Sequence, residues 1–512
     1  MRRRAGIALT AAVVLGTTAC AGAVQEAQSG GQAGDTLTVV TIAPPQSLDP
    51  AKAQQNDAWF EQLAYEPLVV RHSDGTLQPG LATSWNYEGT GNTRFVLHLR
   101  PGVKFSDGSE LTAQNVVDHF TYITAAHGQL APFFTGDTFA ATDPLTVTVT
   151  AASPNPNFPE LLTQDYLVGG VISPKGLQAA AQLGTQTAGA GPYTLDPAQT
   201  TTGDHYTYVP NPNYYDPGAV HWKRVVLKVI TNGQSVLNAL KTGQADVAVG
   251  DASTMDAAKQ AGLTIAAAPL LWNGVVLADR DGTLAKALSD VRVRQALNYA
   301  TDRAAIASAL FGGNAQPAGQ ITVPGGYGYD AALDNAYPHD VAKAKGLLAE
   351  AGYPNGFPLR IVTPEYQQMN LVAQALAQQW KEIGVELQIT DYASTTEYTS
   401  DAFGAKFPAF MTAFGQLPVW MEGPALFLPP ATYNPFKTQD ATLQSLYDQA
   451  ARSSGPDKDK LDQQILGQLT HQAWFVPVVT TTLPFYARKS VSGAATSAKA
   501  PLLSLYEIQP AG

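Results

Sequence analysis

The chain has 512 residues, of which 45% are hydrophobic and only 14% are charged, against about 25% charged residues in typical globular domains. At roughly 150 residues per domain, this length is too great for one hydrophobic core and predicts about three folded units. The 31 basic and 42 acidic side chains give a net charge of -11. This charge repels phosphate backbones and excludes nucleic acid as an expected partner.

The first 20 residues have the pattern of an export signal. Arginines at positions 2–4 precede an apolar run over residues 5–16, and small residues lead from there to Cys20. The apolar run is shorter than the ~20 residues that a membrane-spanning helix needs. We therefore expect a chain that is exported and does not span the membrane.

Cys20 is the only cysteine, so it cannot close an internal disulfide. It lies where a bacterial lipoprotein signal carries its lipidated residue, and we expect a lipid on its sulfur. Thr17 stands where such signals usually have leucine, so ordinary cleavage with a free thiol is the alternative. Residues 21–34, rich in glycine, glutamine and alanine, are predicted to be a flexible tether. The folded part is then expected at the outer face of the cytoplasmic membrane, lipid-anchored or periplasmic.

The folded part begins with β-forming residues 36–43, which predict a buried strand. Three prolines in residues 44–53 exclude regular structure there and predict a loop at the strand end. Open α/β sheets bind ligands in loops that leave the carboxyl ends of strands. Pro45 and Gln46 in this loop are therefore candidates for ligand contact.

Residues 95–123 predict a piece of scaffold. Apolar and polar residues alternate over 95–100, as in a strand with one buried face. A turn and a second short strand over 103–105 follow, and Thr112 is placed to cap a helix with an apolar stripe. No residue in the segment carries evident chemistry, so we expect it to brace the fold.

Two strand-helix-strand units are predicted further along the chain. The first has strands over 222–230 and 245–250 around a helix that starts at residue 235 and ends at Gly243. The second has strands over 359–363 and 385–390 around an apolar helical stripe that ends before Gly384. Both units predict mixed or parallel α/β sheets covered by helices.

Several motifs resemble the bacterial extracellular solute-binding protein family 5, which includes the peptide and nickel receptors of ATP-driven importers. Each motif is weak alone, but their order and spacing extend over the chain after the tether. They are SLDP (47–50), YEPLV (65–69), DGTLQPGLATSW (74–85), GAGPY (189–193), NPNYYDPGAVHWKRVVLKVI (211–230), ALKTGQADVAVG (239–250), VRVRQALNYATDRAAIASALFGG (291–313) and AKGLLAEAGYPNGFPLRI (344–361).

The resemblance implies an α/β fold of the periplasmic-binding-protein type (type II, cluster C), with two lobes, mixed sheets and an extra subdomain inserted in lobe I. The expected signal peptide covers residues 1–20 and ends at the lipidated cysteine, and the tether covers 21–34. The expected folded units are lobe I over 35–58, 165–270 and 484–512, the inserted subdomain over 59–164, and lobe II over 271–483.

The resemblance also implies a monomeric, non-enzymatic receptor that captures a solute between its lobes and delivers it to two ABC permease subunits and their ATPases. A di- or oligopeptide is the first expectation for the solute. An oligosaccharide, a nickel chelate, haem or another small organic molecule is the alternative, and a secreted hydrolase is a third hypothesis. No cofactor is expected.

The expected ligand contacts come from the loops that the resemblance places at the cleft. They are Pro45, Gln46, Trp272, Asn273, Phe414, Gln416 and Trp420. Peptide receptors of this family often carry an aspartate in the last of these loops, where it pairs with the peptide ammonium. Residues 414–419 contain no acid, and Glu422 follows a few residues later, so an ammonium anchor at that point is in doubt.

The sequence gives little support for a metal site or for hydrolytic catalysis. The G-x-S-x-G, H-E-x-x-H and G-x-x-x-x-G-K-[ST] motifs are missing from the sequence. Paired carboxylates for glycoside cleavage stay open. No two histidines are three or four residues apart, so no metal ligand is assigned. The histidines are His72, His98, His119, His127, His205, His221, His339 and His471.

Overall fold

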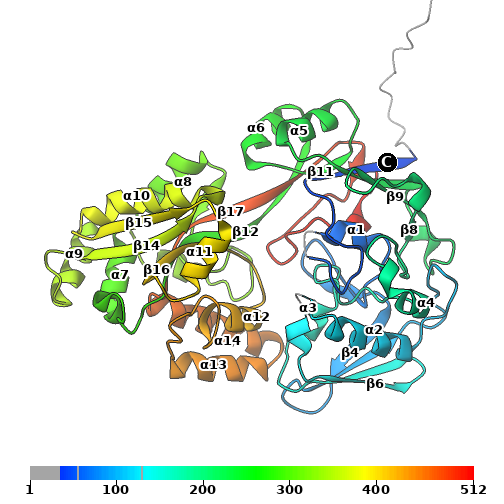
Figure 1. Cartoon of the computed structure of the whole chain (residues 1–512), viewed down its shortest axis with the longest axis horizontal. Coiled ribbons are helices and arrows are strands. Elements are labelled where there is room, and N and C mark those ends of the chain that lie inside the picture. Colours follow the sequence, from blue (N-terminus) through cyan, green and yellow to red (C-terminus); the bar gives the residue numbers. More distant parts are fainter. Residues whose placement is uncertain (1–34, 55–56, 129–130, 512) are drawn as a thin grey trace, which may run out of the picture. The chain divides into compact units, whose positions relative to one another are not determined.

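The computed structural model describes residues 35–54, 57–128 and 131–511. Within these residues, one sheet of eleven strands has the order β15-β14-β16-β12-β17-β11-β1-β10-β9-β8, with β13 paired to β17 (Figure 1). The strands are β1 Thr36–Thr41, β8 Tyr193–Leu195, β9 His205–Pro210, β10 Arg224–Val229, β11 Val247–Val249, β12 Thr264–Leu277, β13 Ala315–Pro317, β14 Pro358–Pro364, β15 Glu386–Tyr392, β16 Ala409–Gly415 and β17 Phe475–Ala487.

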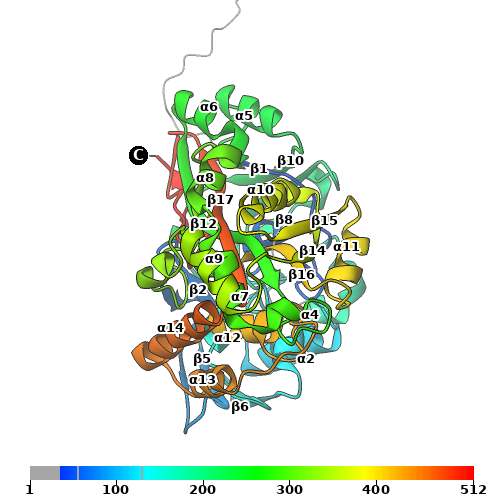
Figure 2. The ribbon, with the colours of Figure 1, turned by 90° about the vertical axis from the view of Figure 1, so that its left-hand side faces the viewer.

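The long antiparallel strands β12 and β17 connect the two lobes, and Figure 2 shows them side by side. One end of β17 pairs with β11 of lobe I, whereas the distal half of β12 pairs with β16 of lobe II. The register between them shifts between Pro269 and Leu271. Proline cannot donate to a sheet ladder, and such irregularities bend strands. The crossing therefore has a built-in bend between the lobes.

The first predicted strand-helix-strand unit is present in lobe I. Strands β10 and β11 flank β1, and both run parallel to it. The connecting helix α5 (Gly233–Lys241) begins where the Asn232 side chain accepts from the backbone N of Ser235 at 2.9 Å. Helix α6 (Met255–Gln260) follows β11. The predicted strand over 36–43 is also present, as β1.

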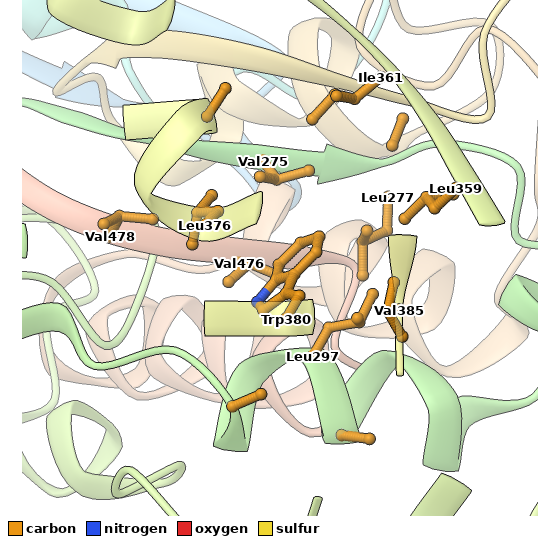
Figure 3. Close-up of a cluster of buried hydrophobic side chains, with 14 of the residues drawn as sticks. Val275, Leu277, Leu297, Leu359, Ile361, Leu376, Trp380, Val385, Val476 and Val478 are labelled. Atoms are coloured by element: carbon orange, nitrogen blue, oxygen red, sulfur yellow. The ribbon is translucent and has the colours of Figure 1, made fainter. Parts of the chain in front are cut away.

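The second predicted unit forms the centre of lobe II. Helix α10 (Met369–Lys381) connects the parallel strands β14 and β15. It buries Leu376 and Trp380 against the sheet, as Figure 3 shows, and the indole nitrogen of Trp380 donates to the hydroxyl of Thr301 at 3.0 Å. The other helices of this lobe are α7 Val291–Tyr299, α8 Arg303–Phe311, α9 Val341–Glu350, α11 Thr395–Ala402, α12 Val419–Glu422, α13 Ala441–Ala451 and α14 Gly455–His471.

A separate four-stranded sheet, β4-β5-β7-β6, packs against helix α2 around its own hydrophobic core. The predicted strand over 95–100 is β5, and Thr112 caps α2 as expected. The prediction of a short strand over 103–105 is wrong, because this segment forms only an isolated bridge between Lys104 and Glu110. The elements here are α1 Ala58–Gln62, β2 Val69–Arg71, β3 Leu77–Pro79, β4 Ala82–Tyr87, β5 Arg94–Leu99, α2 Ala113–Ala125, β6 Thr138–Asp143, β7 Thr146–Thr150, α3 Phe158–Leu161 and α4 Pro174–Gln178.

The C-terminal residues return to lobe I, where β18 (Val491–Ser492) pairs with β19 (Gln509–Pro510). The expected lobe and subdomain boundaries stay predictions. The signal peptide, Cys20 and the tether lie outside the described residues. Among the described residues, no helix combines the length and the apolar character needed to cross a bilayer.

Candidate functional site: a cavity between the lobes

A cavity of about 370 Å³ is lined by residues from both lobes and from the C-terminal segment. A larger cavity of about 510 Å³ exists, but its lining comes only from residues 427–444 and Trp474 of lobe II. Closure of two lobes over a solute requires contacts from both, so the first cavity is the candidate site. Its lining is Arg71, Asp165, Tyr166, Leu270, Leu271, Tyr327, Phe414, Gly415, Gln416, Leu417, Ala498, Lys499, Pro501 and Leu502.

Arg71, the last residue of β2, is the most constrained polar group of the lining. Its side chain is 3% exposed, and its Nε donates to Oδ2 of Asp165 at 2.8 Å. The backbone N of Arg71 donates to Oε1 of Gln164 at 2.9 Å, and Nε2 of Gln164 donates back to the Arg71 carbonyl at 2.6 Å. Burial raises the pKa of Asp165, while the neighbouring guanidinium lowers it. The arginine is thus fixed on both its backbone and its side chain.

Tyr327 links this arginine to lobe II and to the C-terminal segment. Nη1 of Arg71 donates to the Tyr327 hydroxyl at 3.0 Å. The ammonium of Lys499 lies 5.3 Å from the centroid of the Tyr327 ring, a distance at which a cation is attracted to the aromatic face. Residues from three separate parts of the chain therefore meet at one tyrosine.

Phe414 and Gln416, two of the residues expected at the site, do line the cavity. Phe414 lies near the carboxyl end of β16, and Gln416 directly follows that strand. Phe414 packs edge-on against Tyr433 at 5.3 Å between ring centroids. Oε1 of Gln416 accepts from the hydroxyl of Thr322 at 2.7 Å, and its backbone N donates to the Leu270 carbonyl at 2.9 Å.

Trp272 and Asn273 do not line the cavity and are buried, with exposures of 1% and 2%. The Trp272 ring packs edge-on against Phe475, 5.6 Å away, in the core of lobe II. Side chains alternate between faces along a strand, so Leu271 faces the cavity and Trp272 points into the core. Within the described part of the chain, Nε1 of Trp272 and Oδ1 of Asn273 have no hydrogen-bond partner.

The other expected contacts lie outside the lining. The half-buried Trp420 in α12 packs near Phe133, with 6.3 Å between ring centroids. Gln46 is exposed, and its amide oxygen accepts from Nε2 of Gln54 at 3.1 Å, while Pro45 beside it is half-buried. A ligand role for these residues stays a prediction.

Glu422 does not replace the missing acid of the cleft loop. Its side chain is 1% exposed and lies outside the lining. Burial raises the pKa of its carboxyl well above the ordinary value and so disfavours the charged form that an ammonium would need. In the described ranges, moreover, no cluster of three or more His, Cys, Asp or Glu residues could hold a metal ion.

The sequence analysis missed Arg71, Asp165, Tyr327 and Lys499. A charged residue at the end of the apolar strand PLVVR was a usable signal for Arg71. No local pattern, however, connects it to a tyrosine 256 positions away. Only the folded chain brings these groups together.

Known proteins resemble this chain in sequence and in fold. The family model for bacterial extracellular solute-binding proteins, family 5 (middle region), matches residues 76–432. The glutathione-binding protein GsiB of Escherichia coli K12 is 28% identical over 356 residues, which cover 67% of each chain.

Two solved structures share the fold. HbpA2 from Haemophilus parasuis superposes with a TM-score of 0.81 at 22% identity, covering 93% of this chain and 99% of that one. The ABC transporter substrate-binding protein CtaP from Listeria monocytogenes has a TM-score of 0.78 at 21% identity, covering 94% and 100%. These likenesses confirm the predicted two-lobe α/β fold, and the family match confirms a solute-binding protein in place of an enzyme. The chain belongs to the bacterial extracellular solute-binding proteins of family 5.

Proposed function

We propose that this chain is the extracytoplasmic receptor of an ABC importer, which holds a solute between its lobes and delivers it to the permease. The single observation that carries the proposal is a cavity walled by both lobes beside a bent two-strand crossing. In a hinged receptor the ligand contacts both walls only when the lobes meet, so binding favours the closed form. Shifting that equilibrium from 1:99 to 99:1 takes about 5.5 kcal/mol of preferential binding.

A di- or oligopeptide is the cargo that the comparisons favour. GsiB is named for glutathione, and a Helicobacter pylori relative in fold, DppA, is a complex with the peptide STSA. The cavity of about 370 Å³ is within the ~300–1,000 Å³ range of small-molecule sites. Non-peptide cargo is the alternative, because AgaA was solved with agropinic acid and NikZ of Campylobacter jejuni with Ni(L-His).

The receptor role can be tested by binding to the full-length protein. A true cargo should raise the unfolding free energy by RT ln(1 + [L]/Kd), about 2.7 kcal/mol at a hundredfold excess over Kd. Mass spectrometry of the recovered cargo should show it chemically intact. A peptide that is cleaved during incubation would contradict the receptor role and favour the hydrolase.

The anchor and the assembly are part of the same proposal. Cys20 carries the lipid, the receptor acts as a monomer, and two permease subunits with their ATPases receive the cargo. A lipid-anchored chain should fractionate with membranes, and Cys20→Ser should appear in the soluble or culture fraction because its membrane signal is removed. Immunoblotting of the fractions measures this, and membrane retention of the variant would contradict the anchor.

A further inference from the structure

Two cationic groups converge on Tyr327 in the cavity lining. Arg71 reaches its hydroxyl at 3.0 Å, and the ammonium of Lys499 faces its ring at 5.3 Å. Lys499 is exposed and has no ion pair with another described residue. Both cations belong to the lining of the same cavity, where they attract an incoming anion.

Part of the Arg71 guanidinium is free for a ligand. Its Nε is bonded to Asp165, and its Nη1 is bonded to Tyr327 and, at 3.4 Å, to the carbonyl of Gly75. Its Nη2 makes no hydrogen bond to the described residues, and this atom is not fully buried. Nη2 is therefore an unpaired donor that is not fully buried, in a side chain that lines the cavity.

The cavity lining has one acid for its two cations. Asp165 is the one acid among the lining residues, and its Oδ2 already accepts from Arg71. Glu160 acts on Arg71 only through space and does not line the cavity. The lining therefore holds two cations, Arg71 and Lys499, against one carboxylate, and this excess of positive charge favours an incoming anion over an incoming ammonium.

The apolar residues of the lining indicate the character of the rest of the cargo. Leu271, Phe414, Leu417 and Leu502 present apolar surface to the same cavity. Binding pockets of this kind combine apolar walls with a few polar groups that set orientation. The fitting solute is amphipathic, with an anionic end and an apolar body.

We propose that Arg71 and Lys499 bind a carboxylate of the cargo, so that this receptor selects small amphipathic carboxylic acids. The inference rests on the proposed receptor function and adds to it the chemical group of the cargo that the receptor binds. Nη2 of Arg71 can donate a charge-assisted hydrogen bond to a carboxylate oxygen, and the ammonium of Lys499 supplies a second positive charge. A peptide would enter with its C-terminal carboxylate at Tyr327, and its ammonium would not be held in this cavity.

The experiment compares matched probes on the full-length protein. Three libraries of di- to tetrapeptides are prepared as free peptides, N-acetyl peptides and C-terminal amides, beside apolar carboxylic acids and their methyl esters. The free and N-acetyl forms and the acids should bind, and the amides and esters should bind at least about tenfold more weakly. Amides or esters that bind as tightly as their acids overturn the inference, as does a failure of every carboxylate probe.

Failure of the inference is distinguishable from failure of the receptor function. If the purified protein carries an intact cargo without a carboxylate, identified by mass spectrometry, the receptor function stands and the carboxylate anchor is wrong. If peptides fail while other carboxylic acids bind, the anchor stands and the peptide class is wrong.

Variants locate the anchor. Lys499→Gln removes one cation from an exposed position. It should weaken the binding of free acids about tenfold and leave the binding of amides unchanged. Lys489→Gln, an exposed lysine outside the lining, is the matched control and should leave both unchanged. Arg71→Lys retains a charge against Asp165 but loses the unpaired Nη2 donor, and should also discriminate less between acid and amide. The assignment is overturned if the ratio of acid affinity to amide affinity is the same in Lys499→Gln, Arg71→Lys and the control.

Discussion

Glu66 shows how strongly burial changes the chemistry of a single residue in this fold. It is 4% exposed, and its two carboxyl oxygens accept from the hydroxyls of Tyr214 at 2.9 Å and Tyr215 at 2.8 Å. The guanidinium of Arg100 lies 4.8 Å from the centroid of the Tyr215 ring. Burial raises the pKa of Glu66 to about 7, although both tyrosines and Arg100 act to lower it. This carboxyl is therefore part-protonated at neutral pH.

This shift predicts a pH dependence of stability. Between the ordinary pKa of 4.5 and about 7, the folded chain keeps a proton that the unfolded chain has released. The contribution of Glu66 is therefore complete below pH 4.5 and is lost as the pH rises to 7, by about 3 kcal/mol. Glu66→Gln cannot titrate, so its unfolding free energy should fall about 3 kcal/mol less than that of the wild type between pH 4.5 and 8. Denaturant unfolding measures this difference, and parallel curves would contradict it.

At the scale of the element, helix α2 shows local sequence directing local structure. Thr112 and Asn115 form a reciprocal cap, in which the Thr112 hydroxyl accepts from the Asn115 backbone N at 3.3 Å. Oδ1 of Asn115 accepts from the Thr112 backbone N at 2.9 Å. These groups are separated by only three residues, so the sequence alone was sufficient to place the helix start.

The cap makes a second stability prediction. Thr112→Ala leaves donors of the first turn unsatisfied and should lower the unfolding free energy by about 1 kcal/mol. Thr121→Ala is the matched control, since Thr121 is exposed within α2 and its hydroxyl donates to the Val117 carbonyl of the same helix. It should be neutral or slightly stabilising. Equal losses in both variants, measured by thermal unfolding, would show that the cap is not responsible.

Other elements depart from the local pattern. The apolar stripe of α10 predicts the helix but not its start, which is Met369, after Gln367 and Gln368 in left-handed conformations at φ of 53° and 58°. Non-glycine residues occupy this region only where the surrounding structure requires it. Residue preference therefore does not predict the turn between β14 and α10.

At the scale of the whole molecule, the inserted subdomain contacts lobe II away from the cavity. Nδ2 of Asn92 donates to the carbonyls of Ala451 at 3.0 Å and Ser453 at 2.9 Å. Met421 of α12 is 2% exposed and belongs to the hydrophobic core of the subdomain. These contacts join parts that a hinge at β12 and β17 would separate, so they favour the closed arrangement.

Removing this contact should weaken cargo binding without touching the cavity. Asn92 has a φ of 52°, so Asn92→Gly removes the side chain while keeping a backbone that glycine adopts readily. Loss of two hydrogen bonds that exist only when the lobes meet should weaken binding about tenfold. Small-angle scattering of the cargo-free protein should show a larger radius of gyration.

Ser453→Ala is the control for this variant. The Ser453 hydroxyl donates to the Gln449 carbonyl at 2.8 Å. Asn92 donates to the backbone carbonyl of Ser453, which the substitution leaves in place. The control should therefore bind cargo like the wild type. Unchanged affinity and scattering in Asn92→Gly would show that this contact does not bias closure.

The sequence alone was enough to predict the family and the helices and strands that are determined by local residue patterns. Period-two and helical patterns predicted β5, α5, α10 and their neighbouring strands, because side-chain burial repeats at fixed intervals along a chain. The order of family motifs predicted the two lobes. The same resemblance placed Phe414 and Gln416 in the loop expected at the cleft, and both line the cavity.

Only the tertiary structure decided which side chains share the cavity. Trp272 and Leu271 are adjacent in sequence, yet strand geometry directs one into the core and the other to the cavity. Arg71, Tyr327 and Lys499 belong to three segments that meet through the strand crossing and the return of the C-terminal residues. Periodicity fixes which face of an element is buried, but contacts between distant elements depend on how those elements pack, and that packing assembled the site.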